Sequence, residues 1–588
     1  MTKTPPAKGR NRSVIRRLLP FLAPYRRRIV LLVAVMIVSN LLSLATPLLS
    51  GRAVDGIGVA KGGVNFAIVT KNCLLMLGCF TLSGLLSYFL STSLIRLGQN
   101  VSRDLRRAVF DKLVTLPVSY FDTHPSGEII SRICYDIDTI NASLSTDLLQ
   151  VATSFITVVG SLAMLLSISP LLSLVFLVTI PVTTLFSRRQ MLRLHPLFQK
   201  RSAMLGKLNG FAEESVSGLR TVRAYGREEA MQKRFDGINA EAIEAYFRAD
   251  YESCMLGPSV NFINNVSLSA ISMFGSLLYL AGGLTLGSVS SFVLYSRKFS
   301  GPIREASNIL SEIQAAITAA ERVFLLLDAP PESPDKADAV PLANVLGHVN
   351  LQSVSFGYTP EKLVLSDVSV DVPAGSVIAV VGPTGAGKTT IVNLLMRFYD
   401  VTGGRILVDG VDVRDAVRRD LRLAYAMVLQ DTWLFYVTIY DNIAYGSAAA
   451  TRERVTEVAK AAKIHSFIDS LPDGYDTILS DDGVNISKGQ KQLLTIARAM
   501  LIETNLLILD EATSNVDTGT ELEINEAMEK LMAGKTCFVI AHRLSTIEHA
   551  DRILVVDGGR IVEAGTHKEL LSRGGAYAEL YASQFEIR

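Results

Sequence analysis

The chain has 588 residues, too many for a single domain, and its length alone suggests roughly three or four. Hydrophobic residues make up 49% of it, charged residues only 19%, and the mean hydropathy is +0.32, values that are unusual for a wholly soluble protein. The net charge of +2, with no long basic run beyond the N-terminus, argues against a nucleic-acid partner. The five cysteines are scattered without a CxxC or Cys/His cluster, so disulfides and structural zinc are not expected.

Charge-free apolar windows predict six membrane-spanning helices in the first half, because about 20 such residues cross the hydrocarbon core of a bilayer. Windows 29–51 and 72–95 are long enough for one span each. Windows 148–187 and 253–296 are long enough for two spans each, divided at "SISP" and at "AGGLTLGS". Arginine and lysine gather before the first span and after the second, fourth and sixth, whereas the other links carry few charges. This asymmetry predicts that both termini are cytoplasmic.

Two long cytoplasmic extensions are predicted between the spans. Roughly 50 to 65 residues with a charged amphipathic helix pattern separate the second span from the third and the fourth from the fifth. We expect helical stalks that end in turns near 120–129 and 209–228. These turns are candidates for docking on a cytoplasmic motor domain, the alternative being solvated loops.

Three asparagines lie within the fifth predicted span. Asn261, Asn264 and Asn265 are three or four residues apart and therefore share one helix face. Polar groups at membrane depth face the bundle interior or a water-filled cavity, which makes these residues candidates for a substrate pathway. Hydrogen bonding that only holds the bundle together is an equal alternative.

Beyond a Pro-, Asp- and Ala-rich linker the composition becomes that of a soluble α/β domain. The segment "VIAVVGPTGAGKTT" has the pattern G-x-x-x-x-G-K-S/T between an apolar strand and a helix, which is the context that a phosphate-binding loop requires. Its glycines allow backbone N–H groups to surround a phosphate. Lys388 is expected to reach the β and γ phosphates, and Thr389 to place its hydroxyl on Mg²⁺.

Two further segments offer phosphate chemistry. "LLILDE" is a buried-strand pattern that ends in Asp510, a candidate Mg²⁺ ligand, and Glu511, where a carboxylate can polarise an attacking water. In "NISKGQKQLLTIARAM", Ser487 and Gly489 precede a helical pattern, so a hydroxyl and a helix N-terminus form a second anion-binding arrangement. A single nucleotide would not easily contact both phosphate-binding surfaces of one domain. This favours an arrangement in which one of the two surfaces binds the nucleotide held by a neighbouring copy.

These motifs together resemble an ABC transporter half-subunit of the exporter type, and the resemblance covers essentially the whole chain. Walker A is "GPTGAGKTT", Walker B is "LLILDE", the signature is "ISKGQ", the Q-loop contains Gln430, the D-loop ends at Asp517 and the switch histidine is His542. The implied fold is an all-α membrane domain with six transmembrane helices and long cytoplasmic extensions, followed by an α/β P-loop ATPase. We expect the membrane domain at 1–325, a linker at 326–345 and the nucleotide-binding domain at 346–588.

The resemblance implies ATP and Mg²⁺ as ligands and assigns roles to the motif residues. Glu511 would be the general base and His542 would contact the γ-phosphate, with Gln430 and Asp517 completing the catalytic set. Mg²⁺ would be held by Thr389, Gln430 and Asp510. The residues implied on this chain's own ATP are Tyr358, which would stack on adenine, Gly382, Thr384, Gly385, Ala386, Gly387, Lys388, Thr389 and Thr390. Those implied on the ATP of the other subunit are Ser487, Lys488, Gly489 and Gln490. The cytoplasmic turns would then act as coupling helices.

The signature departs from the family pattern LSGGQ at Ile486 and at Lys488, which adds a charge near the partner's nucleotide. The segment before it carries Asp481 where the family has Glu. The Walker side is complete and the signature side altered, which favours a heterodimer with a second half-transporter over a homodimer. The expected function is ATP-driven export of amphipathic or hydrophobic molecules, such as drugs, lipids or peptides, across a bacterial inner membrane, because no targeting segment is present.

Three other functions remain open from the residues alone. The same fold could import a siderophore-like ligand, since nothing in the spans excludes it. A regulatory or channel-like protein that binds ATP without turnover is opposed by the intact Glu511 and His542. A soluble P-loop NTPase would leave the six apolar windows and their basic flanks unexplained.

Overall fold

The computed structural model describes residues 8–57, 63–430, 432–447, 449–479, 486–510, 518–540 and 547–585. The chain divides into two compact units, which we describe separately. The first contains residues 1–114 and 126–329, and the second contains residues 115–125 and 330–588. Residues 120–125, the first part of the turn predicted at 120–129, therefore belong to the same unit as the ATPase motifs. The domain limits expected from the sequence stay a prediction.

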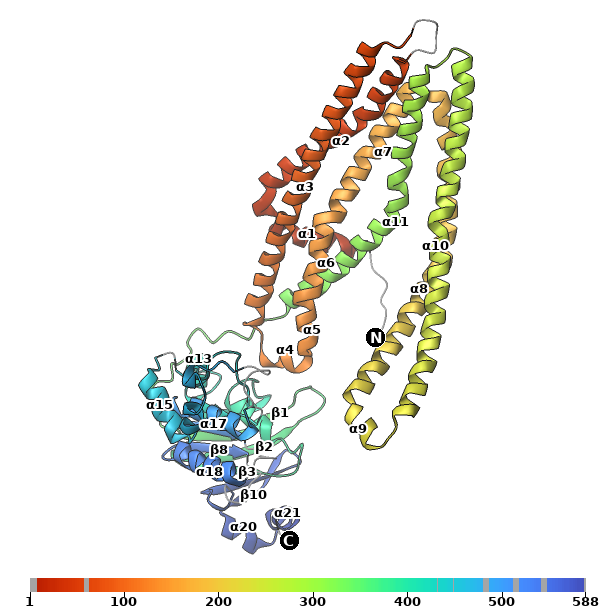
Figure 1. Cartoon of the computed structure of the whole chain (residues 1–588). Coiled ribbons are helices and arrows are strands. Elements are labelled where there is room, and N and C mark those ends of the chain that lie inside the picture. The colour runs from red at the N-terminus through yellow and green to blue at the C-terminus, as the bar shows by residue number, and fades with distance from the viewer. Residues whose placement is uncertain are drawn as a thin grey trace. The chain divides into compact units, whose positions relative to one another are not determined.

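The first unit is built from long helices (Figure 1). The longest are α2 (Arg26–Asp55), α3 (Phe66–Leu113), α7 (Leu148–Ile168), α8 (Pro170–Ser217), α10 (Glu228–Leu280) and α11 (Leu286–Asp328). Shorter elements are α1 (Lys8–Leu22), the 3₁₀ turn η1 (Ala23–Tyr25), α5 (Ser126–Ser131), the π-helical turns η2 (Arg132–Asp136) and η3 (Ser143–Asp147), α6 (Ile137–Ala142) and α9 (Leu219–Ala224). A helix of 48 residues such as α3 is about 72 Å long, more than twice the hydrocarbon core, so the predicted extensions are present.

Five helices of the described chain are long and apolar enough to cross a membrane. They are Arg16–Asp55, Phe66–Leu113, Ser126–Ile168, Pro170–Ser217 and Glu228–Leu280. Helix α11 has 43 residues, but serines, Arg297 and Lys298 interrupt its apolar stretch. The sixth span therefore stays a prediction. The predicted divisions are confirmed, because α7 ends at Ile168 before the N-cap Ser169, and α10 ends at Leu280 five residues before the N-cap Thr285.

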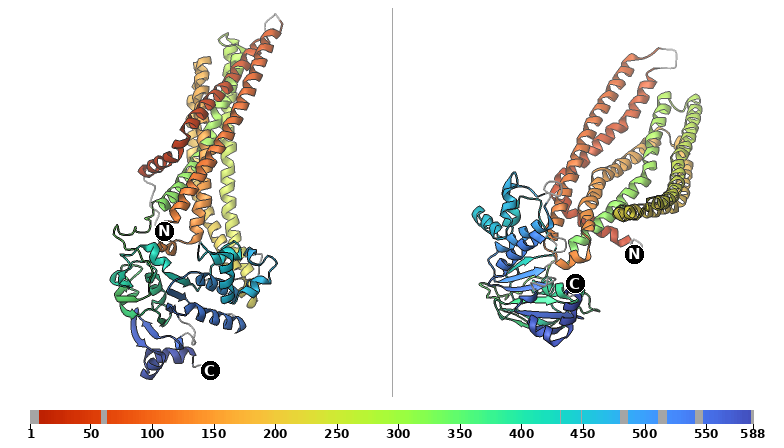
Figure 2. Two further views of the ribbon diagram at one scale, coloured as in Figure 1. Left: turned by 90° about the vertical axis from the view of Figure 1, so that its left-hand side faces the viewer. Right: turned by 60° about the horizontal axis from the view of Figure 1, so that its bottom comes forward.

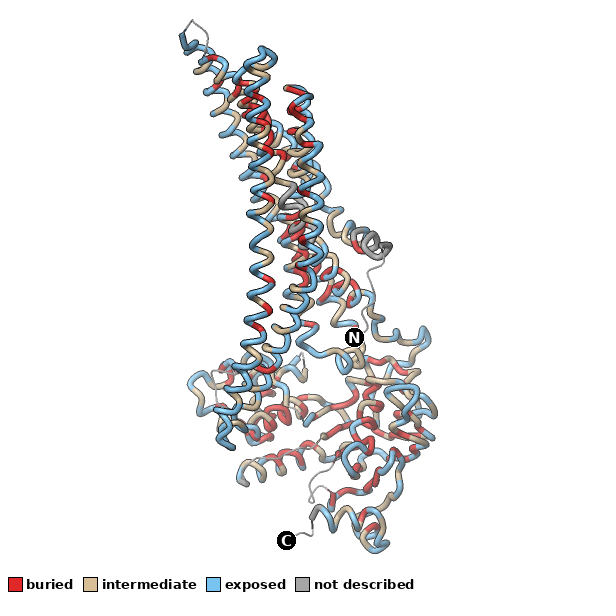
Figure 3. Tube along the Cα trace, turned by 90° about the vertical axis from the view of Figure 1, so that its right-hand side faces the viewer, coloured by how far each residue is buried: buried red, intermediate tan, exposed pale blue. Residues whose placement is uncertain are grey.

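The turn predicted at the end of the second extension contains a short helix, α9, between α8 and α10, and these two long helices run side by side in all views (Figures 1 and 2). The large apolar side chains of the long helices are mostly exposed in the single chain, whereas buried residues gather in the second unit (Figure 3). Exposed apolar surface of this extent in a water-soluble protein would promote aggregation, and it is what a lipid bilayer covers.

A proline in α2 explains how Lys298 is accommodated in the helical unit. Pro47 has no N–H, so the carbonyl of Ser43, four residues earlier, lacks its usual helical donor. The ammonium of Lys298 on α11 donates to this carbonyl and, at 2.7 Å, to the hydroxyl of Ser43. The same carbonyl also accepts from the hydroxyl of Thr46 at 2.8 Å, so Lys298 is a second donor to it, one that links α11 to α2.

The second unit contains two sheets. An antiparallel sheet has the order β2-β1-β4-β5, with β1 (Val349–Phe356), β2 (Leu365–Val372), β4 (Gly403–Val408) and β5 (Val411–Asp412). The larger sheet has the order β10-β9-β3-β8-β7-β6, with β3 (Val377–Val381), β6 (Tyr425–Val428), β7 (Leu506–Asp510), β8 (Thr536–Ile540), β9 (Arg552–Asp557) and β10 (Arg560–Gly565). Strands β6, β7, β8, β3 and β9 are parallel to one another.

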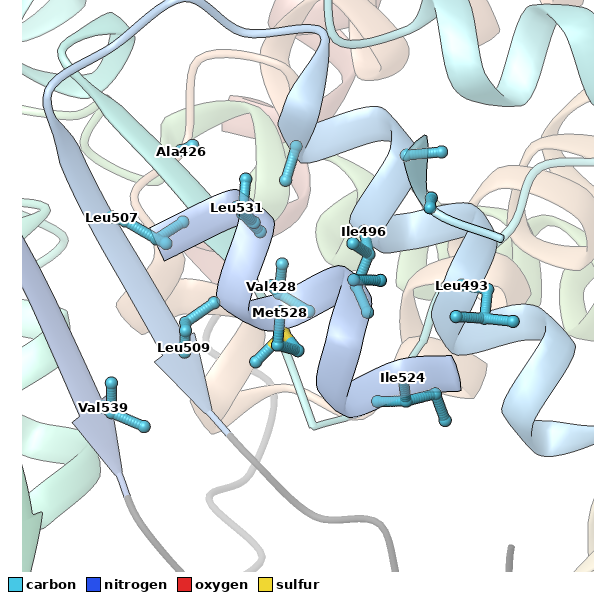
Figure 4. Packing of buried hydrophobic residues seen from close by; sticks show 14 of the residues in the cluster. Ala426, Val428, Leu493, Ile496, Leu507, Leu509, Ile524, Met528, Leu531 and Val539 are labelled. Carbon is cyan, nitrogen blue, oxygen red and sulfur yellow. The ribbon is translucent and has the colours of Figure 1, made fainter. Parts of the chain in front are cut away.

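Helices cover the larger sheet and complete the core. Those of the second unit are α4 (Val118–Thr123), α12 (Lys388–Leu395), α13 (Arg418–Leu423), α14 (Ile439–Ala444), α15 (Arg452–Ala461), α16 (His465–Asp469), η4 (Gly474–Asp476), α17 (Lys488–Met500), α18 (Thr518–Met532), α20 (His567–Arg573) and α21 (Ala576–Phe585). Ile496 of α17 and Met528 of α18 pack with Leu509 of β7 in one buried cluster (Figure 4). This packing holds the signature helix α17 on the sheet.

The linker between the units has no long element but is held by charge pairs. Glu332 accepts hydrogen bonds from Arg422 at 2.5 and 3.1 Å, and Asp335 accepts from the backbone N–H of Arg418 at 3.1 Å. The ammonium of Lys336 pairs with Asp415. The segment therefore follows the surface of the second unit rather than floating free of it.

Candidate nucleotide-binding site

The parallel strands bring the sequence motifs to one edge of the larger sheet. The glycine-rich loop follows β3, Gln430 lies two residues after β6, and Asp510 is the last residue of β7. Because β3, β8, β7 and β6 are neighbours and parallel, their carboxyl ends meet at the same edge. Ligands of open α/β sheets bind at this edge. The predictions for Glu511, Asp517 and His542 fall on residues outside those that the structure describes.

The glycine-rich loop needs glycine at two positions. Gly387 is the N-cap of α12 with φ 104°, and a Cβ there would lie 2.7 Å from Cδ2 of Leu365. Gly382 has φ 151°, and its Cβ would lie 2.0 Å from the carbonyl oxygen of Val556. A side chain at either site would displace the loop from the adjacent strands. The predicted strand, loop and helix are confirmed, with β3 and α12 on either side.

Lys388 is buried inside this loop. Its ammonium donates to the carbonyls of Gly382 at 2.7 Å and of Pro383 at 3.0 Å. Burial lowers the pKa of Lys388, and the nearby carboxylate of Asp510 opposes that shift. Both of these hydrogen bonds go to neutral carbonyls. A triphosphate would offer the ammonium charged oxygen acceptors, and hydrogen bonds to charged acceptors are stronger. The loop therefore fits a nucleotide phosphate.

The two threonines after Lys388 have different surroundings. Thr389 is exposed at the start of α12, where its hydroxyl is accessible to a ligand. Thr390 is buried, and its hydroxyl lies 3.2 Å from the hydroxyl of Tyr358. Thr384 and Gly385 are exposed in the loop and Ala386 is buried. The residues predicted on the phosphates thus form one continuous loop.

Tyr358 is held as a platform beside the loop. Its ring meets Phe356 and Tyr399 edge-on, each with 5.0 Å between ring centroids. Its hydroxyl also accepts from the side-chain amide of Asn393 at 3.2 Å, while 47% of the residue remains exposed. Such an aromatic fixed by edge contacts can stack on a nucleobase. The sequence reading missed Phe356, Asn393 and Tyr399, since no motif signals residues that only support another ring.

The signature segment forms the N-terminus of α17. Ser487 is the N-cap, and its hydroxyl accepts from the N–H of Gln490 at 3.2 Å. The side chain of Gln490 accepts from the N–H of Ser487 at 2.9 Å, which completes a capping box. The helix starts at Lys488, so Gly489 lies inside its first turn and not before it as predicted. Lys488 is exposed there, where its cation opposes the helix dipole and favours anions.

The three asparagines of the predicted substrate pathway line one cavity of about 250 Å³ in the helical unit. They share a helix face as predicted. Arg297 of α11 lines the same cavity. The apolar window predicted from the sequence ends at Ser296 and so leaves Arg297 out, whereas α11 continues through this residue. The role of the asparagines in a substrate pathway stays a prediction.

Both parts of the chain match models of the ABC transporter family. Residues 29–303 match the ABC transporter transmembrane region, and residues 365–514 match the ABC transporter family. A fatty acid ABC transporter ATP-binding/permease protein of Mycobacterium tuberculosis is 45% identical over 527 residues, which cover 90% of this chain and 83% of that protein. The chain belongs to the ABC transporters.

Two further relatives match this ABC transporter over nearly the full length of its chain. An ATP-dependent lipid A-core flippase of Syntrophus aciditrophicus is 33% identical over 574 residues, covering 98% of this chain and 95% of the flippase. The structure of a bacterial Atm1-family ABC exporter with ATP bound has a TM-score of 0.77 and 31% identity, covering 96% of this chain and 99% of that one. The transporter is therefore an exporter-type half-transporter that couples ATP hydrolysis to transport, with a helical membrane domain followed by an α/β nucleotide-binding domain.

Proposed function

We propose that this transporter exports amphipathic or hydrophobic molecules as one half of a dimer, with a related half-transporter as its favoured partner. Two separate features of the ATPase unit support the dimer, namely the phosphate loop at Lys388 and the helix N-terminus at Ser487. In a head-to-tail dimer, ATP on one loop meets the signature helix of the other subunit. Closing on two ATP molecules would draw the cytoplasmic extensions together and turn the substrate cavity outward.

The proposed substrates are amphiphiles, because relatives bear the names of a fatty acid transporter and a lipid A-core flippase. Export from the inner membrane of a bacterium with a cytoplasmic ATPase agrees with the basic flanks of the spans. We infer that Mg²⁺ is held by Thr389, Gln430 and Asp510, since a hydroxyl, an amide oxygen and a carboxylate are hard oxygen ligands. Mg²⁺ would neutralise the charge that develops during phosphoryl transfer.

Within this site each residue has a separate task. Lys388 binds the phosphates, Tyr358 orients the adenine, and Glu511 accepts a proton from the attacking water. His542 would contact the γ-phosphate, and Asp517 would complete the catalytic set. Ser487, Lys488, Gly489 and Gln490 contact the ATP of the other subunit. The fixed loop and tyrosine place the phosphates before chemistry begins, so positioning costs little at the reaction step.

ATP hydrolysis by the full chain in lipid, expressed alone, tests the proposal beside Glu511→Gln. Turnover that falls by about 10²-fold or more in the variant would establish Glu511 as the base and two copies of this chain as sufficient. ATP binding without turnover would mean that hydrolysis needs the related half-transporter as partner. Turnover that survives Glu511→Gln unchanged would refute the proposed site.

A further inference from the structure

The cavity lined by the three asparagines has an unusual chemistry for a membrane domain. Its walls come from α8, α10 and α11. The polar side chains at the cavity are Asn261, Asn264, Asn265, Ser267, Ser296, Arg297 and Ser300. Phe176, Leu268 and Ile271 add apolar surface beside them. The cavity therefore presents a cation and hydrogen-bond donors next to a surface that accepts hydrocarbon.

Arg297 lies inside α11, one residue beyond the apolar window 253–296. It is eleven residues after the start of α11 at Leu286, which corresponds to about 16 Å along the helix. The hydrocarbon core of a bilayer is about 30 Å thick, so a helix that entered it at Leu286 would carry the Cα of Arg297 about halfway across. An arginine at this depth is costly unless it faces a polar cavity and finds a partner.

No hydrogen bond or ion pair joins Arg297 to another described residue, in contrast to its neighbour. Lys298 donates to the carbonyl and the hydroxyl of Ser43. No counterion is available along the cavity walls either, because the sequence has no Asp or Glu within 170–212, 253–280 or 286–304. One cation thus has a structural partner and the other does not.

The donor set specifies an anion. A guanidinium offers a planar fork of N–H donors that matches carboxylate and phosphate oxygens. Asparagine amides and the hydroxyl of Ser300 add further donors, whereas the hydroxyl of Ser296 donates to the carbonyl of Phe292 at 2.7 Å. We propose that this cavity binds the anionic headgroup, a carboxylate or a phosphate, of an amphipathic substrate, with Arg297 as its charge partner. This inference rests on the proposed export function and names the class of substrate.

Photo-crosslinking of the full chain in phosphatidylcholine nanodiscs without ATP tests this inference. The probes are a diazirine-bearing C16 fatty acid, the matching alkyl phosphate and the matching alcohol, and mass spectrometry maps the label. We expect the acid and the phosphate to label α8, α10 and α11 about tenfold more than the alcohol. Equal labelling by acid and alcohol would overturn the inference without the need for any variant.

Variants then assign the charge preference to Arg297. Arg297→Gln is expected to lower labelling by the acid about tenfold and to leave labelling by the alcohol unchanged, whereas Arg297→Lys keeps part of the preference. Arg193→Gln is the matched control, because it removes an exposed arginine of α8 that does not line the cavity. Full labelling by the acid in Arg297→Gln would contradict the assignment.

Competition identifies the source of the anion. Displacement of the acid probe by free laurate indicates a single-chain substrate, and displacement by phosphatidylglycerol added to the nanodisc indicates a membrane lipid headgroup. Both results support an anion site, and displacement by neither overturns it. Since labelling needs no ATP, turnover that survives Glu511→Gln together with intact labelling would refute only the proposed nucleotide site. Normal turnover without a charge preference would refute only the anion site.

Discussion

The hydroxyl of Tyr399 donates a hydrogen bond to the carboxylate of Asp122, 277 residues earlier in the chain. Asp122 lies in α4, a short helix in the turn predicted at the end of the first extension, and α4 belongs to the same compact unit as the ATPase motifs. The ring of Tyr399 also meets Tyr358 edge-on, at 88° between ring planes. One side chain thus touches both the proposed adenine platform and a proposed coupling helix. Burial and the bond to Asp122 raise the pKa of Tyr399, so its hydroxyl remains a donor at neutral pH.

Tyr399→Phe should loosen α4 while the contact between the two rings remains. A hydrogen bond to a charged group contributes about 1.5–3 kcal/mol, and partial exposure favours the lower end. We therefore expect amides of residues 115–125 to exchange about tenfold faster in hydrogen exchange followed by mass spectrometry. Tyr436→Phe is the control, because this tyrosine is 75% exposed. Unchanged exchange in Tyr399→Phe would show that the bond does not hold the helix.

Lys388→Ala should abolish stabilisation by ATP. In the wild type, ATP at about 100 times its Kd should stabilise the fold by about 2.7 kcal/mol, which thermal unfolding detects as a rise in Tm. The variant loses the ammonium that faces the phosphates, so its Tm should not respond to ATP. Lys460→Ala, on the exposed face of α15, should keep the full response. An equal ATP-dependent rise in Lys388→Ala would contradict the role of this residue.

Much of the nucleotide site could be predicted because its signals are local. The loop around Lys388 requires a strand, glycines and a helix within a short segment, and all of these are present in sequence order. Ser487 with Gln490 three residues later is likewise a local capping pattern. The start of α17 was misplaced by two residues because glycine favours a boundary but is tolerated in a first turn.

The supporting contacts could not be predicted, because they join residues distant in sequence. Nothing near Asp122 specifies Tyr399 as its partner, and nothing near Ser43 specifies Lys298. Arg297 was visible in the sequence, but only the cavity shows that it lies beside the three asparagines. Periodicity predicts which face of a helix is polar, whereas packing of several helices decides which polar faces meet.

Ser487→Ala separates helix capping from nucleotide contact. Losing an N-cap hydroxyl costs about 1 kcal/mol, and Thr566→Ala should cost the same, because Thr566 and Glu569 form an equivalent capping box at α20. Both variants should therefore show a similar fall in Tm. Only Ser487→Ala should also lower ATP hydrolysis, by about tenfold or more, because it alone removes a donor to the partner's ATP. Equal hydrolysis in the two variants would leave Ser487 with a capping role alone.

Lys298 and Pro47 should be energetically coupled. Lys298→Met removes one of the two donors to the Ser43 carbonyl and leaves the hydroxyl of Thr46, whereas Pro47→Ala supplies the missing helical N–H. The lysine substitution should therefore cost more stability in the wild type than in Pro47→Ala, with a coupling energy of about 0.5–3 kcal/mol. Thermal unfolding of the four proteins in one detergent measures this double-mutant cycle. Additive effects would mean that the hydroxyl of Ser43 alone, 2.7 Å from the ammonium, accounts for the position of Lys298.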